Sequence, residues 1–280
     1  MKRKQLKKFK KRGKVTPVVP AYIKQLKDYE TEYQDYPAVT YLIKQILLAD
    51  QFLAKQQLPQ NLPDLELPDD IQDQIYRKIN EKYDMGDPKG DELWEKLSSD
   101  LPELDRKLRS FRDYLEEQYG MWAYISSGFT AELAKFLNGR PALEVMAGNG
   151  YISQGLQNNH AQIIATDSLT WTHENQTGKQ TVVPVEQLTA LEAYEKYKDQ
   201  VDFIIMCWSP DGLPIDMELL NSIRNDDYPV QLLVIGEQNG ATNSPEFWQT
   251  AKFVTTDDLT ELNQFYPHFD LIKDQVYLVK

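Results

Sequence analysis

The chain has 280 residues, of which 41% are hydrophobic, and a formal net charge of −12, which suits one good-sized domain with a smaller appendage. Its single cysteine, Cys207, excludes an intramolecular disulfide, and one cysteine with three scattered histidines gives no zinc-ligand spacing, so no metal is expected. No apolar run approaches the roughly 20 residues that cross a bilayer, and the basic N-terminus lacks the apolar core of a signal peptide. We therefore expect a cytoplasmic protein without membrane contact.

Residues 1–15 are expected to form a basic tail. They hold nine of the 31 lysines and arginines and no acidic residue. Such a block of like charge indicates a solvated, disordered tail, and an arm that binds nucleic acid or another anionic surface is the alternative. The acidic remainder of the chain would repel a polyanion, which favours the first interpretation.

Residues 16–118 are expected to form a helical domain. Residues 40–58 have the length and apolar content of a buried helix, and apolar side chains recur at helical spacing in two later stretches. These side chains are Ile71, Ile75, Ile79 and Tyr83 in the first stretch, and Leu104, Leu108, Phe111 and Leu115 in the second. The proline- and acid-rich segments 57–70 and 83–91 are expected connectors.

The second of these helices carries its own start and stop signals. Asp100 is the expected N-cap, Pro102 would lie in the first turn, and Gly120 would end the helix. After Gly120 comes an aromatic segment that includes Trp122 and Tyr124, followed by a helix at about 130–137. This segment predicts aromatic packing between two domains or, as the alternative, a lid over a ligand pocket.

From residue 141 onward the pattern changes to short apolar runs that alternate with amphipathic segments. The runs are 142–147, 162–167, 181–186, 201–208, 229–237, 269–274 and 275–280. Such alternation predicts a parallel sheet with crossover helices on both faces. The last two runs are contiguous, so an antiparallel hairpin is expected there. The predicted fold is thus a doubly wound, mostly parallel α/β sheet closed by an antiparallel strand and preceded by helices.

A glycine bend follows the first of these runs, in the sequence LEVMAGNGYIS. A dinucleotide fingerprint would need a third glycine where Ser153 stands, which weakens the case for NAD, and the phosphate-loop pattern for ATP or GTP is missing from the sequence. Glu144, four residues before Gly148, would repel a pyrophosphate but suits an ammonium group. Asp167 ends the second run, where a carboxylate accepts both hydroxyls of a ribose. Both acids fit a cofactor with a ribose, a cationic amino-acid end and no phosphate.

On these residues, segment 119–280 resembles the class I S-adenosylmethionine-dependent methyltransferases, with a Rossmann-like fold. LEVMAGNG is similar to their first motif, although Met146 replaces the first glycine. The resemblance implies S-adenosyl-L-methionine as cofactor and one-carbon transfer as the activity. The cofactor-binding residues that we predict are Glu144, Ala147, Gly148, Asn149, Gly150, Asp167, Ser168, Glu186, Gln187, Cys207 and Tyr124.

The fourth-strand motif, CWSPDG, would lie beside the transferable methyl group, so Trp208, Ser209, Pro210 and Asp211 are the predicted catalytic residues. Amino-methyltransferases of nucleic acids have a second proline and an aromatic residue where this sequence has Asp211 and Gly212. A small-molecule or unknown acceptor is therefore favoured. The alternatives are a nucleic-acid acceptor reached through the basic tail, a protein side chain, and a catalytically degenerate cofactor-binding or partner protein, and the sequence leaves the oligomeric state open.

Overall fold

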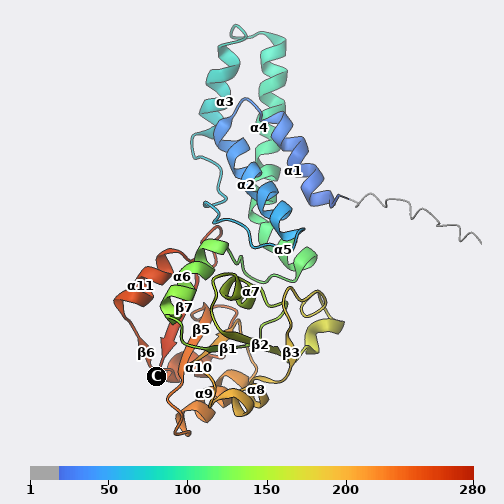
Figure 1. Cartoon of the computed structure of the whole chain (residues 1–280). Helices are drawn as coiled ribbons and strands as arrows, with labels where there is room; N and C mark the ends of the chain where they lie inside the picture. The colour runs from blue at the N-terminus through green and yellow to red at the C-terminus, as the bar shows by residue number, and fades with distance from the viewer. Residues whose placement is uncertain (1–18) are drawn as a thin grey trace, which may run out of the picture.

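The computed structural model describes residues 19–280, and the predicted basic tail, residues 1–15, lies outside them. Five helices stand on one side of an α/β layer structure, and the hairpin of α3 and α4 projects farthest from it (Figure 1). The bounds of these helices are α1 Ala21–Glu32, α2 Pro37–Leu53, α3 Ile71–Asn80, α4 Pro88–Arg109 and α5 Phe111–Tyr119. The helical character predicted for this part of the chain is confirmed, and 57–70 is a connector as expected.

Helix α4 begins earlier than its sequence signals predicted. It starts at Pro88, and the side chain of Asp87 caps it by accepting a hydrogen bond from the backbone N–H of Lys89 (2.9 Å). The prediction of a start at Asp100 was wrong, because Pro102 lies inside the helix and a buried leucine stripe stabilises the helix on both sides of it. That stripe consists of Leu97, Leu101, Leu104 and Leu108. Gly120 does end α5, with a left-handed φ of 60°.

The sheet has seven strands in the order β3-β2-β1-β4-β5-β7-β6. Strands β3, β2, β1, β4 and β5 are parallel, whereas β7 pairs antiparallel with both β5 and β6. The bounds are β1 Ala142–Val145, β2 Ile163–Asp167, β3 Glu186–Gln187, β4 Phe203–Cys207, β5 Gln231–Glu237, β6 Phe253–Val254 and β7 Asp274–Val279. The order of the parallel strands is that of a Rossmann-like doubly wound sheet, with its reversal between β1 and β4.

The predicted hairpin of 269–274 with 275–280 was wrong. Residues 269–273 are irregular, and the strand that pairs with β7 on the side away from β5 is the short β6. The segment is engaged elsewhere, because the backbone carbonyl of Phe269 accepts a hydrogen bond from Leu65 (3.1 Å) and Asp270 pairs with Arg112 (2.6 Å). It therefore anchors the preceding helices and does not pair as a strand.

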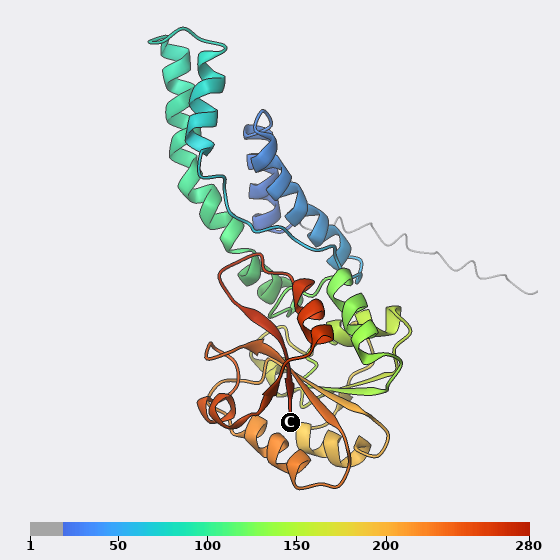
Figure 2. The same ribbon diagram turned by 90° about the vertical axis from the view of Figure 1, so that its left-hand side faces the viewer.

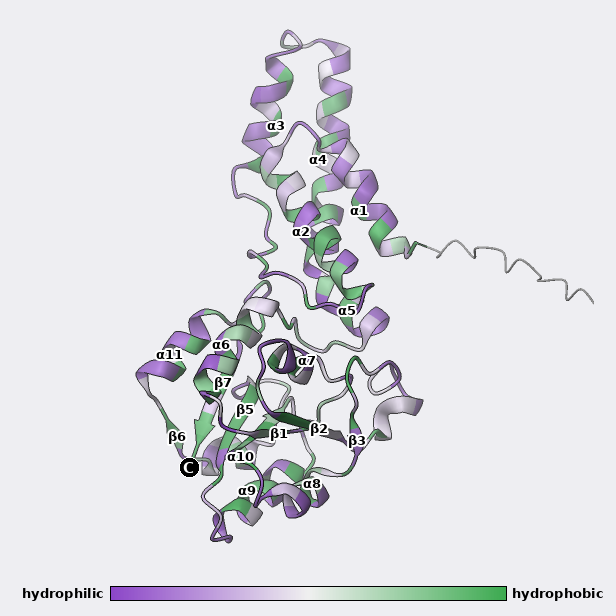
Figure 3. Cartoon of the chain, viewed as in Figure 1, coloured by the Kyte–Doolittle hydropathy of each residue, from purple (hydrophilic) through white to green (hydrophobic). Residues whose placement is uncertain are grey.

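Helices cover both faces of the sheet (Figures 1 and 2). One face packs against α6 (Ser127–Leu137), α7 (Tyr151–Asn158) and α11 (Asp257–Gln264), and the other against α8 (Ala190–Tyr197), α9 (Ile215–Arg224) and α10 (Pro245–Thr250). Each face of the sheet has its own hydrophobic core, and alternate residues of a strand pack into opposite cores. In β4, Phe203 and Ile205 face one side and Ile204 and Met206 the other. The core on the α6 side continues without a break into helices α1 to α5, and hydrophilic residues lie on the outer faces of the helices (Figure 3).

Candidate active site

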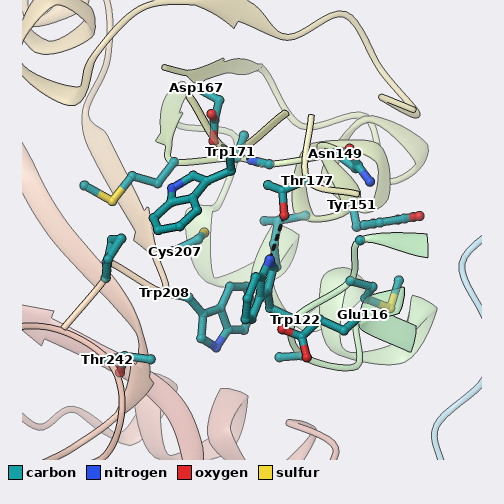
Figure 4. Close-up of a pocket in the computed structure, with 18 of the residues that line it drawn as sticks. Glu116, Trp122, Asn149, Tyr151, Asp167, Trp171, Thr177, Cys207, Trp208 and Thr242 are labelled. Carbon is teal, nitrogen blue, oxygen red and sulfur yellow. Dashed lines mark hydrogen bonds between the residues drawn. The ribbon is translucent and has the colours of Figure 1, made fainter. Parts of the chain in front are cut away.

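One cavity of about 710 Å³ lies at the carboxyl edge of the sheet. Segments that follow β1, β2, β4 and β5 line it, together with α5 and residues 120–125 of the linker after it. Side chains from these separate segments point into a common space (Figure 4). Ligands of doubly wound sheets bind at this edge, next to the reversal of strand order.

The bend after β1 supplies the cavity with backbone atoms. Met146 has φ 59° and Gly148 has φ 56°, so a non-glycine residue adopts the left-handed conformation at the place where the resemblance called for a first glycine. Leu169 after β2 and Trp208 after β4 also have positive φ values, 57° and 43°. Non-glycine residues in this region are strained by about 1–3 kcal/mol each and gather at functional sites. All three of these residues follow strands that end at the cavity.

Glu144 is buried beneath this bend and borders the cavity. Its carboxylate accepts hydrogen bonds from the backbone N–H of Ser153 (3.0 Å) and from the Ser153 hydroxyl, and the thiol of Cys207 approaches it at 3.6 Å. Burial raises the pKa of Glu144 to about 7, although these hydrogen bonds act in the opposite direction. Ser153, where a dinucleotide fingerprint has glycine, thus serves to hold the acid.

Asp167 is held by the backbone on both sides. One carboxylate oxygen accepts from the N–H of Gly148 (2.8 Å) and the other from the N–H of Leu169 (2.6 Å). An ionised carboxylate has about four acceptor positions, so about two remain, and Asp167 borders the cavity. The two amides fix the orientation of the carboxylate and leave it able to accept two hydroxyl groups.

Asn149 connects the loop after β2 to the last residue of α5. Its side-chain amide donates to the backbone carbonyls of Tyr119 (2.7 Å) and Gln176 (3.3 Å), and its side-chain oxygen accepts from Gly178 (2.7 Å). Every polar atom of this buried side chain is therefore used within the protein, although Asn149 also borders the cavity. These contacts position the cavity wall.

The CWSPDG loop forms the part of the wall after β4. Trp208 donates its indole N–H to Asp274 (3.3 Å), and Pro210 forms an isolated bridge with Thr242. Cys207, Trp208, Pro210 and Asp211 border the cavity, whereas Ser209 is fully buried behind it.

We compared the protein with known families, curated proteins and solved structures. No family model matches the sequence, and no curated protein matches it either. Among similar solved structures are Sp1610 of Streptococcus pneumoniae, a candidate tRNA (m1A22) methyltransferase, and the plantazolicin methyltransferase BpumL in complex with SAH. A third is human N-acetylserotonin methyltransferase in complex with SAM.

The similarity to these three structures is low in both sequence and structure. Sequence identities are 15%, 11% and 12%, and TM-scores are 0.29, 0.33 and 0.34, in that order. The matches cover 53%, 75% and 75% of this chain, and 67%, 95% and 65% of the respective structures. The strand order is, independently of these structures, that of a Rossmann-like doubly wound sheet.

Five of the predicted cofactor or catalytic residues lie outside the cavity lining, namely Tyr124, Gly150, Glu186, Gln187 and Ser209. Glu186 instead accepts hydrogen bonds from Lys196 and Tyr197 (2.5 Å each), and Gln187 donates to the carbonyl of Ser168 (3.3 Å). Tyr124 is buried and donates to the carbonyl of Gln60 (2.5 Å).

Gly150 has a packing role at the start of α7. Its φ is 83°, and a Cβ there would lie 2.6 Å from a methyl group of Val183. A side chain would thus be both strained and crowded. The remaining predicted residues, which are Glu144, Ala147, Gly148, Asn149, Asp167, Ser168, Cys207, Trp208, Pro210 and Asp211, are brought together around the cavity.

Sequence reasoning missed several residues of the cavity. Arg112 and Glu116 come from α5, Trp171 from the loop after β2, and Asp274 from the start of β7. Their sequence surroundings carry no motif, and Arg112 and Glu116 lie on a helix whose apolar stripe indicated only a core. Within residues 19–280, no cluster of three or more His, Cys, Asp or Glu residues is placed to hold a metal ion, and no helix is long and apolar enough to span a membrane.

Proposed function

We propose that the protein transfers a methyl group from S-adenosyl-L-methionine to a small-molecule acceptor. The observation that carries the proposal is that one continuous cavity joins Glu144 and Asp167 to the CWSPDG loop. Catalysis of group transfer depends chiefly on holding two reactants in line, and a shared cavity brings the two sites within one enclosure.

The cofactor half of this cavity fits S-adenosyl-L-methionine. Asp167 has acceptor positions free for the ribose hydroxyls, and Ser168 beside it borders the same space. Glu144, buried and negatively charged when ionised, suits the ammonium group of the amino-acid end, directly or through an ordered water. The bound cofactor would supply a methyl group on a sulfonium centre, which needs no metal.

The acceptor half is formed by Trp208, Pro210 and Asp211, with Trp122 and Trp171 as further walls. These side chains can orient the acceptor and exclude water from it. Cavities of about 300–1,000 Å³ are usual for small ligands, so a volume of about 710 Å³ suits two small molecules better than a folded partner. Of residues 19–280, six carboxylates and one arginine line the cavity, which disfavours a polyanionic acceptor.

Calorimetric titration tests the proposal. S-adenosylmethionine and its demethylated product S-adenosylhomocysteine should each bind with measurable heat and raise the melting temperature, whereas NAD should do neither. A thermal shift with NAD but none with either sulfur compound would refute the cofactor assignment. A methyl-transfer screen over nucleic-acid, protein and metabolite pools would then identify the acceptor, and transfer confined to nucleic acid or protein would refute the small-molecule part.

A further inference from the structure

Three indole rings wall the acceptor half of the cavity. Trp122 comes from the linker after α5, Trp171 from the loop after β2, and Trp208 from the end of β4 (Figure 4). The indole N–H of Trp122 donates to the Thr177 hydroxyl (2.7 Å), and that of Trp208 donates to Asp274 (3.3 Å). Because the polar edges of these two rings are engaged within the protein, they offer a ligand carbon surface and π electrons. Their position fits a ligand with an apolar or cationic surface.

The exposure of these rings supports the same conclusion. Trp122 is 46% exposed and Trp171 is 37% exposed, although both border an apolar cavity. Leu213, at the end of the CWSPDG loop, is also 46% exposed and borders the same cavity. Apolar surface that remains in water at the mouth of a cavity marks a place that a ligand covers.

The charged groups of the cavity are almost all carboxylates. Among residues 19–280, the one cation that lines it is Arg112, and that guanidinium is held by Asp270 (2.6 Å) and Asp274 (3.3 Å). Two carboxylates therefore already neutralise Arg112, and the arginine is not free to bind an anionic ligand.

Three carboxylates on the acceptor side stand without a cation. For Glu116, Asp211 and Glu237, no lysine, arginine or histidine within residues 19–280 lies at ion-pair distance. Glu237 accepts a hydrogen bond from the backbone of Lys273 (2.9 Å), so that carboxylate is oriented but remains uncompensated. Burial raises the pKa of Glu116, and the nearby charge of Asp113 acts in the same direction, while the charge of Arg112 opposes both. A further positive charge in the cavity would stabilise the ionised form of Glu116.

We propose that the acceptor of this methyltransferase-fold protein is a small organic cation, with an ammonium or guanidinium group next to an apolar body. The indoles of Trp122 and Trp208 would cover the apolar body and contact the cation through their ring faces, and Glu116 would supply the opposite charge. An anionic acceptor meets only repulsion and an arginine that is already neutralised. The inference rests on the proposed function, because it concerns the acceptor half of the same cavity.

A matched pair of probes tests the charge preference. Choline and 3,3-dimethylbutan-1-ol have nearly the same shape and differ in the quaternary nitrogen, which is a carbon in the alcohol. Each would be titrated into the full-length protein, free and saturated with S-adenosylhomocysteine, with calorimetry and tryptophan fluorescence as readouts. We expect choline to bind at least tenfold more tightly than the alcohol and to change the tryptophan emission.

Substitutions in the cavity wall test which residues cause the preference for choline. Glu116→Gln and Trp122→Leu should each weaken choline binding by about threefold to tenfold, and Glu116→Gln should leave binding of the alcohol unchanged. Glu117→Gln is the matched control, because Glu117 is exposed, lies on the same helix and does not border the cavity. Trp94→Phe is the control for the indole, since Trp94 lies on α4 away from the cavity.

The outcomes distinguish failure of the cationic-acceptor proposal from failure of the proposed function. If S-adenosylhomocysteine binds and choline binds no better than the alcohol, the cationic acceptor is refuted while the proposed function stands. If S-adenosylhomocysteine does not bind, the proposed function fails, and the choline preference of the free protein still tests the charge selectivity of the cavity. Tighter binding of a lysine-containing peptide or of a single-stranded oligonucleotide than of any small amine would refute a small-molecule acceptor.

Discussion

Replacing Asp167 by alanine should lower both stability and cofactor affinity. The carboxylate accepts two backbone N–H groups, those of Gly148 at 2.8 Å and Leu169 at 2.6 Å, and it is only 6% exposed. Hydrogen bonds to charged groups contribute about 1.5–3 kcal/mol each, and cavity water can replace part of both. We therefore expect a loss of about 2–4 kcal/mol in the free energy of unfolding.

The affinity for S-adenosylhomocysteine should fall in the same variant by about 1–3 kcal/mol, which is roughly 5- to 150-fold, because the ribose acceptors are lost. Urea unfolding measures the first effect and titration calorimetry the second. Asp199→Ala, at an exposed position outside the cavity, is the control and should change neither. An Asp167→Ala protein that unfolds at the same urea concentration as the original would contradict the role of the carboxylate in holding the two loops. Unchanged affinity would remove Asp167 from the cofactor site.

Three further predictions concern packing, pH and turnover. Gly155→Ala should destabilise the protein by about 1–3 kcal/mol in urea unfolding, because a Cβ there would overlap Thr130 on α6; an unchanged midpoint would show that the helices can separate freely. Glu144→Gln should become progressively more stable relative to the original protein as the pH rises from about 4.5 to 7 and should gain nothing beyond. The reason is that a raised carboxyl pKa makes the folded state bind more protons than the unfolded state in that interval, so the original loses stability there; a constant difference would contradict the raised pKa. Trp208→Ala should lower turnover at least tenfold and change S-adenosylhomocysteine affinity less than threefold, and an equal loss of both would place this indole against the cofactor.

The sheet could be predicted because two sequence signals indicate its strands. Most of the strands are apolar runs, and polar residues follow at their ends. Asp167 and the bend around Gly148 were found in this way. The site residues of α5 could not be found, because Arg112 and Glu116 act across a contact with segments more than 100 residues away in sequence. Short-range patterns carry no information on which solvent-side residue of a helix will face a distant cavity.

The failed prediction of a hairpin at 269–280 has a physical cause. Residues 269–274 have the composition of a strand, but Phe269 and Asp270 are used for contacts with Leu65 and Arg112, which sequence periodicity does not reveal. Local propensity was overruled there by partners from other elements.

The wall that α5 and residues 120–125 contribute has a consequence for how selectivity can change. Glu144 is held by a backbone amide of α7 and Asp167 by amides of the loops after β1 and β2, while Glu116 and Trp122 reach the cavity from α5 and the segment after it. Under the proposed function, substitutions at Glu116 and Trp122 would alter the choice of acceptor and leave Glu144 and Asp167 untouched. Acceptor choice and cofactor affinity would accordingly diverge independently through single substitutions in α5 and residues 120–125.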